Sequence, residues 1–176
     1  MMPPSRSAPC RLLLGVVLLL AGSLLGVGCE GRGTPPDVPE GRFTAYVTGA
    51  VSDTLSGTAY YRRRDGALTR LEFGARDGPG LSIELEPQPL GLRTYEVLEP
   101  ELFRMERPDS PPGVLAFLSL DHAQFTATDG TLELTYVSEE RIGATFSFQM
   151  TGRFDDGGGN DVSVEVTGAV NAPSGE

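Results

Sequence analysis

Apolar and polar residues alternate with a period of two through most of the chain from Arg42 onward. The clearest stretch covers residues 81–86, in which Leu, Ile and Leu alternate with Ser, Glu and Glu. Successive side chains of a β-strand point to opposite faces of the sheet, so this pattern predicts half-buried strands. Turn signals such as Asp65-Gly66 and Asp129-Gly130 separate the alternating stretches.

About nine or ten short strands are expected after the first 40 residues, and residues 113–120, apolar on both faces, are expected to be central. Only residues 100–107 suggest a helical turn or two, which the following prolines end. Many short strands without alternating helices predict an all-β fold. We expect a single antiparallel β-sandwich, with a half-barrel as the alternative.

The last third of the chain contains the most regular expected strand, residues 141–154. Alternation predicts one face that belongs to the core and one face that points outward. The predicted core residues are Ile142, Ala144, Phe146, Phe148 and Met150, with Val164 from the next strand. The predicted outward residues are Thr145, Ser147, Gln149 and Thr151.

The first 28 residues have the organisation of an export signal. Arg6 and Arg11 precede an uncharged stretch from Leu12 through Gly28, and small residues stand immediately before Cys29. A charged start, an apolar stretch and small residues at the cut are typical of a cleavable signal. An uncleaved membrane anchor is one alternative, but the apolar run is short for a spanning helix of about 20 residues. An ordinary cleaved signal is the other.

The segment Leu24-Leu25-Gly26-Val27-Gly28-Cys29 resembles a bacterial lipobox. That resemblance implies cleavage between Gly28 and Cys29 and acylation of Cys29. The segment departs from the pattern at Gly26, where a lipobox usually has Leu. Glu30, in place of the Asp that favours retention in the inner membrane, implies the outer membrane, on its periplasmic or surface face.

The expected organisation has four parts. Residues 1–28 are a lipoprotein signal peptide, residues 29–40 a lipidated Cys with a Pro-rich tether, residues 41–172 the all-β domain and residues 173–176 a tail. Cys10 lies in the removed part, so the mature chain keeps Cys29 alone, and lipidation would cap this otherwise reactive thiol.

A second resemblance covers the last third of the chain. Residues 130–135 (GTLELT) followed by residues 142–148 (IGATFSF) resemble the closing strands of small bacterial lipoproteins of unknown function. The resemblance implies a β-sandwich in the cell envelope and implies no activity. Ala144 is an insertion relative to that pattern, and we expect it to shift the strand register there.

Charge and composition exclude several classes of function. The formal net charge is −10, all 14 basic residues are Arg, and loss of Arg6 and Arg11 leaves 12 of them against 24 carboxylates. Such a surface does not suit nucleic acid, which is bound by basic faces. It also does not suit anionic lipid, so the acyl chains should hold the membrane. Two Cys and one His do not make a Cys/His zinc site.

Three segments contain residues with a potential chemical role. His122 stands beside Asp121 without a nucleophile motif, so an exposed His is favoured over a hydrolase site. Residues 155–161 (DDGGGND) have a calcium-like composition but lack a calcium-loop spacing, so a plain hairpin loop is favoured. Arg62, Arg63 and Arg64 beside Tyr60 suit a phosphate or a sugar acid, but pairing with neighbours on an edge strand is favoured.

The sequence thus predicts a membrane-anchored bacterial envelope lipoprotein whose domain is a binding or structural module. The alternative is a carrier that encloses an apolar ligand, which requires an apolar cavity on the order of several hundred Å³. No enzyme activity, catalytic residue, metal ligand or cofactor is predicted. The predicted partner is membrane lipid, through acyl chains on Cys29, with no nucleic acid and with the protein or ligand partner left open.

Overall fold

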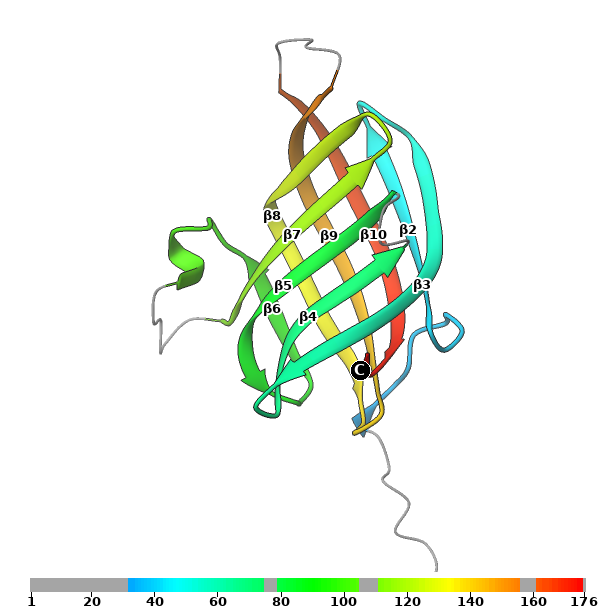
Figure 1. Ribbon diagram of the computed structural model, residues 1–176, viewed down its shortest axis with the longest axis vertical. Helices are drawn as coiled ribbons and strands as arrows, with labels where there is room; N and C mark the ends of the chain where they lie inside the picture. The colour runs from blue at the N-terminus through cyan, green and yellow to red at the C-terminus, as the bar shows by residue number, and fades with distance from the viewer. Residues whose placement is uncertain (1–31, 75–78, 105–110, 156–160, 176) are drawn as a thin grey trace, which may run out of the picture. The chain divides into compact units, whose positions relative to one another are not determined.

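The computed structural model describes residues 32–74, 79–104, 111–155 and 161–175, which form a single domain without α-helix (Figure 1). The prediction of an all-β domain of nine or ten strands is confirmed. The described residues contain ten strands and one 3-10 turn: β1 (Arg32–Gly33), β2 (Arg42–Gly49), β3 (Asp53–Arg64), β4 (Ala67–Gly74), β5 (Gly80–Pro89), β6 (Arg93–Val97), η1 (Leu102–Arg104), β7 (Gly113–Leu120), β8 (Ala123–Val137), β9 (Arg141–Phe154) and β10 (Val162–Pro173).

The strands run up and down and curl around one interior. They pair antiparallel in the order β7, β5, β4, β3, β2, β10, β9 and β8, and β8 pairs again with β7. The curl is irregular because β7 pairs only with the start of β8. Farther along, β6 lies between the two strands and runs parallel to β7. The sheet is therefore mixed rather than purely antiparallel, and its two sides enclose one core.

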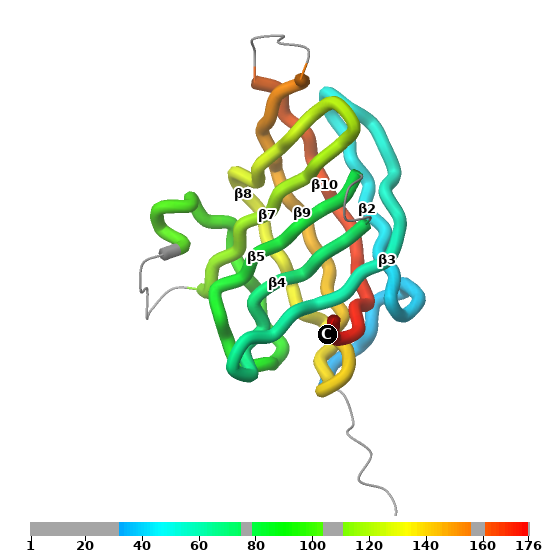
Figure 2. The backbone as a smooth tube through the Cα atoms, in the orientation of Figure 1, coloured from blue at the N-terminus to red at the C-terminus, as the bar shows by residue number. Residues whose placement is uncertain are grey.

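The turns gather at two opposite ends of the domain (Figure 2). We call one the proximal end; it contains β1, residues 174–175 and the turns at residues 65–66 and 138–140. The other is the distal end, which contains the turns at residues 50–52 and 121–122 and the ends of β9 and β10 at Asp155 and Asp161. Most consecutive strands thus run in opposite directions between the two ends, whereas β6 and β7 run in the same direction.

The core is a single cluster of inward-facing side chains with aromatic rings at its centre. The Phe73 ring contacts Phe43 edge-on, with ring centroids 5.3 Å apart, and it contacts Phe146 at 5.8 Å. Phe146 stacks on Phe148 at 5.6 Å. Each fully buried side chain of this size contributes about 1.5–3 kcal/mol relative to its exposed state. These four phenylalanine rings therefore connect β2 and β4, on one side of the curled sheet, to β9.

The predicted orientation of residues 141–154 is confirmed. The five predicted inward residues of this stretch are at most 4% exposed, and Val164 on β10 is 1% exposed. Ser147 and Gln149 are exposed, and Thr145 and Thr151 are half-buried on the outer face. A register shift does occur beside Ala144, where one was expected, but the extra residue belongs to β8 and is Thr135.

The prediction of a turn at Asp129-Gly130 is wrong. Both residues lie inside β8, which continues because β9 pairs with it along almost its whole length. The extra residue is Thr128, whose hydroxyl donates to the Gln149 carbonyl at 3.2 Å. Gly130 has φ +123°, and a Cβ there would lie 2.1 Å from the Ser147 carbonyl oxygen. The dipeptide therefore forms a β-bulge.

The alternation of inward and outward side chains changes phase within β4. Leu71 and Phe73 point inward, and Leu68 is also fully buried, whereas Ala67 and Thr69 are half-buried. A register shift between Leu68 and Arg70 changes the phase of the strand at this point. The bulge decides which side chains of β4 reach the outer surface.

Residues 32–40, which we expected to form part of a spacer, lie along the domain. β1 pairs with residues 136–137 of β8, and Thr34 N–H donates to the Thr135 carbonyl at 2.8 Å. Farther on, the Asn171 side-chain amide donates to the Val38 carbonyl at 2.9 Å. These hydrogen bonds hold the segment against β8 and β10.

Candidate functional site

An open groove of about 750 Å³ lies on the outer face of the sheet, which we call the outer groove. It crosses β3, β4, β5, β7 and the start of β8. Its lining residues are Tyr60, Arg62, Arg70, Glu72, Phe73, Gly74, Gly80, Leu81, Ser82, Phe117, Leu118, Ser119, Gln124, Phe125 and Thr126. The volume lies within the range of about 300–1,000 Å³ typical of small-ligand sites.

Two glycines hollow the groove at the tip of the β4–β5 pair. Gly74 and Gly80 are paired across the two strands. A Cβ at Gly80 would lie 2.5 Å from the Phe73 carbonyl oxygen, and Gly74 has φ +97°, which other residues rarely adopt. Because neither position carries a side chain, backbone is exposed on this part of the floor.

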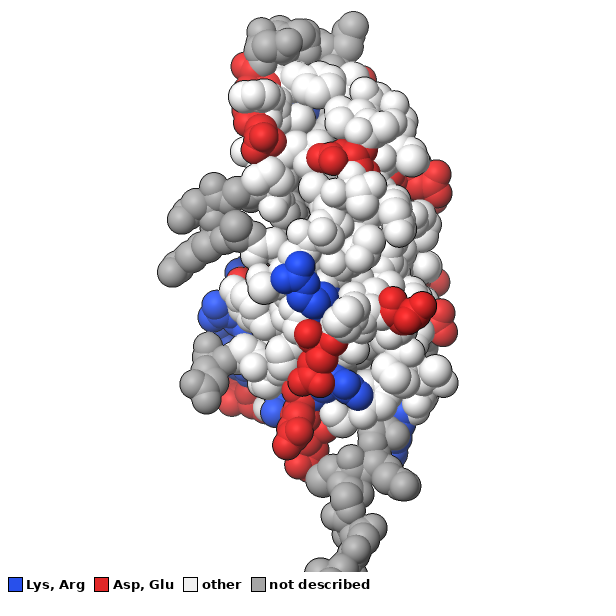
Figure 3. Space-filling view, turned by 90° about the vertical axis from the view of Figure 1, so that its right-hand side faces the viewer, with Lys and Arg blue, Asp and Glu red and all other residues white. Residues whose placement is uncertain are grey.

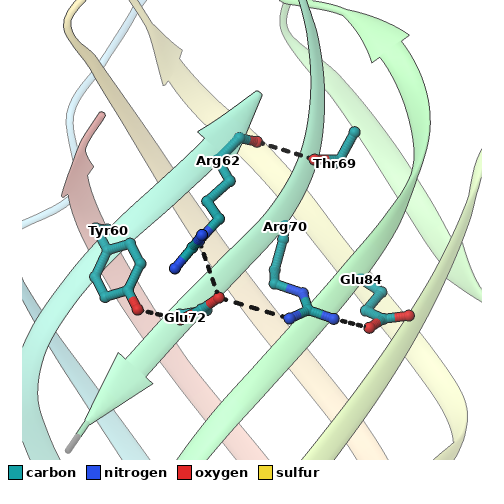
Figure 4. A network of polar contacts seen from close by, with 6 residues as sticks. All are labelled: Tyr60, Arg62, Thr69, Arg70, Glu72 and Glu84. Atoms are coloured by element: carbon teal, nitrogen blue, oxygen red, sulfur yellow. Dashed lines mark hydrogen bonds and ion pairs between the residues drawn. The ribbon is translucent and has the colours of Figure 1, made fainter. Parts of the chain in front are cut away.

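A network of polar side chains forms one side of the outer groove (Figure 4). Glu72 is at its centre: it accepts a hydrogen bond from the Tyr60 hydroxyl and lies 3.2 Å from Arg62 Nε. Arg70 lies 3.6 Å from the same carboxylate and also pairs with Glu84 of β5. Two guanidinium groups and two carboxylates therefore compensate each other within the network.

The β3–β4 register places these residues together. After the bulge of β4 between Leu68 and Arg70, Tyr60 stands opposite Glu72, and Arg62 stands opposite Arg70. Two arginines opposite each other would repel, but Glu72 lies within 3.6 Å of both guanidinium groups and offsets this repulsion. The contact with Tyr60 and then the charge of Glu72 raise the pKa of Arg62 above its ordinary value.

The other side of the outer groove is uncharged. Phe117 on β7 points outward and is 38% exposed, although the preceding residues 113–116 are buried. It stands opposite Thr126 of β8, and Ser119 stands opposite Gln124. Residues 113–120 were expected to be central because they are apolar on both faces. Only the first half of β7 is buried on both faces. In the second half, an exposed aromatic ring is surrounded by small polar side chains.

The lipidation site predicted from the sequence lies outside the described residues. This holds for Gly28 and Cys29, at the predicted cleavage position, and for the rest of the signal segment. Among the residues that the structure describes, no helix has the length and apolar character needed to cross a membrane.

His122 and Asp121 form the turn between β7 and β8 at the distal end, and both side chains are exposed. The His122 carbonyl accepts a hydrogen bond from Asp155 N–H at 2.9 Å. The backbone of His122 thus joins two turns. No described hydrogen bond brings its imidazole to a carboxylate or a hydroxyl.

Of the calcium-like segment, residues 156–160 lie outside the described part of the chain. Asp161 at its end is 2.5 Å from Arg153 Nε, and this hydrogen bond lowers the pKa of the Asp161 carboxyl. Among the described residues, no group of three or more His, Cys, Asp or Glu side chains is arranged to hold a metal ion.

The three consecutive arginines have different environments. Arg62 points into the outer groove, whereas Arg63 donates to the Glu139 carbonyl at 3.2 Å and lies over the Tyr61 ring. Arg64 is exposed beside the turn at residues 65–66. The arginines were expected to lie on an edge strand. Residues 174–175 cover the edge of β3 beside them, and Gly175 N–H donates to the Tyr61 carbonyl at 2.8 Å.

Sequence reasoning identified Tyr60 and Arg62 but missed Arg70, Glu72 and Phe117. An available signal was Phe117 itself, an aromatic residue at an outward position of an otherwise buried strand. No comparable signal joined Glu72 to Tyr60, because the bulge in β4 sets that pairing.

Comparison of the chain with protein-family models, with curated proteins and with solved structures finds no match.

Proposed function

We propose that this protein is a membrane-anchored bacterial envelope lipoprotein whose domain acts as a binding module, and that the outer groove is its binding surface. The lipobox-like segment ending at Cys29 supports the anchoring. One observation carries the binding role: an open groove of about 750 Å³ combines a charge-compensated polar network with an exposed aromatic ring.

The position of the groove favours surface binding over the alternative of an enclosed carrier. The carrier requires an apolar cavity in the interior of the sheet. In the described part of the chain, the inward-facing side chains pack into one continuous cluster, and the groove lies on the outer face. Its lining includes Arg62, Arg70 and Glu72, which do not suit an apolar ligand.

The chemistry of the groove favours an uncharged, hydroxyl-bearing ligand such as an oligosaccharide segment. An anion would compete with Glu72 and Glu84 for the arginines, and a cation would compete with the arginines for the carboxylates. A neutral ligand avoids both costs and can use the hydroxyl and amide groups of Ser82, Ser119 and Gln124. Phe117 provides an apolar surface for the C–H face of a sugar ring.

A binding assay on the full chain in lipid vesicles tests this proposal. The probes are a panel of neutral oligosaccharides, with carboxylated and amino-sugar counterparts as charged comparators. We expect a neutral member to bind and Phe117→Ala to weaken its binding by about tenfold, or about 1.4 kcal/mol. Tyr46→Ala is the matched control, because Tyr46 is 53% exposed on β2 and does not line the groove.

Two results would overturn the proposal. One is equal weakening by Phe117→Ala and Tyr46→Ala, which would separate binding from the groove. The other is no binding of neutral probes, or binding of charged probes only, which would exclude the ligand class.

A further inference from the structure

We propose that the proximal end of the domain rests on the phospholipid headgroups, with the distal end directed away from the membrane. This inference rests on the proposed acylation of Cys29. It adds an interaction surface and an orientation, which acylation alone leaves open.

The first argument is the length of chain between the anchor and the domain. Only Glu30 and Gly31 separate Cys29 from Arg32. A chain extends by at most about 3.6 Å per residue, so these three steps reach about 11 Å. Arg32 is held at the proximal end, because it pairs with Val137 of β8, next to the turn at residues 138–140.

The Pro-rich residues that follow do not lengthen this connection, since they are bound to the domain. The Val38 carbonyl accepts from the Asn171 side chain, and Gly41 N–H donates to the Asn171 backbone carbonyl at 2.7 Å. Glu40 pairs with Arg141 at 3.1 Å. Several contacts would have to break together before this segment could act as a longer tether.

The second argument is the distribution of charge between the two ends. At the proximal end, the exposed carboxylates of Asp65, Glu139 and Glu140 offset the exposed Arg32, Arg63 and Arg64. The exposed carboxylates in and beside the distal turns are Asp53, Asp121, Asp155 and Asp161. Arg153 pairs with Asp161. In the view of Figure 3, the large basic groups likewise lie in the middle and lower parts of the face, whereas acidic groups also reach its upper part.

The described proximal end is thus close to charge balance and the described distal end is net acidic. Anionic headgroups therefore repel the distal end more strongly, which favours the same orientation as the short connection. Anionic headgroups attract basic side chains and repel carboxylates within a Debye length, about 8–10 Å at physiological salt. Only the end nearest the membrane feels this potential. A strand as long as β9, with 14 residues at about 3.3 Å each, carries the distal carboxylates well beyond that distance.

Fluorescence quenching on vesicles tests the orientation. Full-length Glu140→Cys and Asp121→Cys variants are each labelled with one fluorophore, since Cys10 is removed with the signal and Cys29 is acylated in the proposed mature form. The vesicles contain phosphatidylethanolamine, phosphatidylglycerol and a headgroup-nitroxide lipid. Both substitutions are at exposed turn positions. We expect the Glu140 label to lose most of its fluorescence and the Asp121 label to keep most of its own.

A linker variant separates the connection from the charge. Insertion of about eight Gly and Ser residues between Cys29 and Arg32 adds up to about 28 Å of reach. We expect the variant to remain bound and the quenching at Glu140 to fall. Unchanged quenching would overturn the role of the short connection.

The possible failures are distinguishable. Protein that does not float with the vesicles contradicts the proposed anchoring, and the orientation with it. Bound protein with equal quenching at Glu140 and Asp121, or stronger quenching at Asp121, overturns the orientation alone.

Discussion

Tyr60 and Glu72 stand opposite each other on β3 and β4, and the Tyr60 hydroxyl donates to the Glu72 carboxylate on the outer face of the sheet. The pair also orders its surroundings. Arg62 lies over the Tyr60 ring at 5.6 Å and pairs with Glu72, and Arg70 contacts Glu72 from the other side. A single carboxylate thus connects the arginines that form the charged side of the outer groove.

Lipidation of Cys29 is the first prediction, and it follows from the lipobox-like segment. Cys29→Ala should abolish incorporation of a fatty-acid probe and release the protein from the membrane fraction, because the acylated thiol is lost. Cys10→Ala is the matched control and should leave labelling unchanged, since that residue lies in the segment whose removal we propose. Equal labelling of the Cys29→Ala variant would contradict the lipobox prediction.

The second prediction concerns the orientation of β9. Phe146→Ala should lower the free energy of unfolding by about 3–5 kcal/mol, because the ring contacts two other core phenylalanines. Ser147→Ala, on the exposed face, should lower it by less than about 0.5 kcal/mol. Denaturant midpoints measure both effects. Two equally mild substitutions would mean that this strand does not carry the core.

A third prediction concerns Gly168 of β10, where the Phe146 ring packs directly on the backbone. A Cβ at this position would lie 2.3 Å from the Thr44 carbonyl oxygen and 2.6 Å from Phe146 Cζ. We therefore expect Gly168→Ala to destabilise the domain by about 1–3 kcal/mol. Gly91→Ala is the control, because the nearest atom to its Cβ, Arg93 Nη2, lies 3.4 Å away at the end of a flexible side chain. Similar melting temperatures for the two variants would count against this close approach.

The fourth prediction is a loss of stability at alkaline pH that depends on Tyr95. This residue is fully buried, and its hydroxyl has no hydrogen-bond partner among the described residues. Burial, assisted by the charge of Glu86 and opposed by that of Arg93, raises its pKa to about 12 from an ordinary value of 10.0. Because the folded state binds the proton more tightly, this contribution is complete below about pH 10 and disappears as the pH rises toward 12.

Tyr95→Phe should remove this alkaline component and should not destabilise the domain at pH 7, since it deletes a buried hydroxyl without a partner. Tyr46→Phe, at an exposed position, should change neither value. Chemical denaturation at a series of pH values gives both measurements. An unchanged alkaline slope in Tyr95→Phe would show that another group causes the loss.

The sequence by itself determined the all-β class and the faces of the most regular strand. In β9 every second residue is apolar from Ile142 to Met150, and a strand allows only one face for them. The turn at Asp65-Gly66 was likewise predictable, because Asp-Gly is a preferred dipeptide for tight hairpins in which both central residues need positive φ. The two residues have φ +52° and +80°.

Only the tertiary structure decided how the same dipeptide behaves at Asp129-Gly130. There β9 pairs with the residues of β8 before and after the dipeptide. The dipeptide therefore forms a bulge inside a continuous strand instead of a turn. The shift in β4 has the same character, since it brings Glu72 opposite Tyr60 and so creates the charged side of the outer groove. The physical reason is that alternation specifies which residues share a face. The partner strand, through its register, decides which of them stand opposite one another.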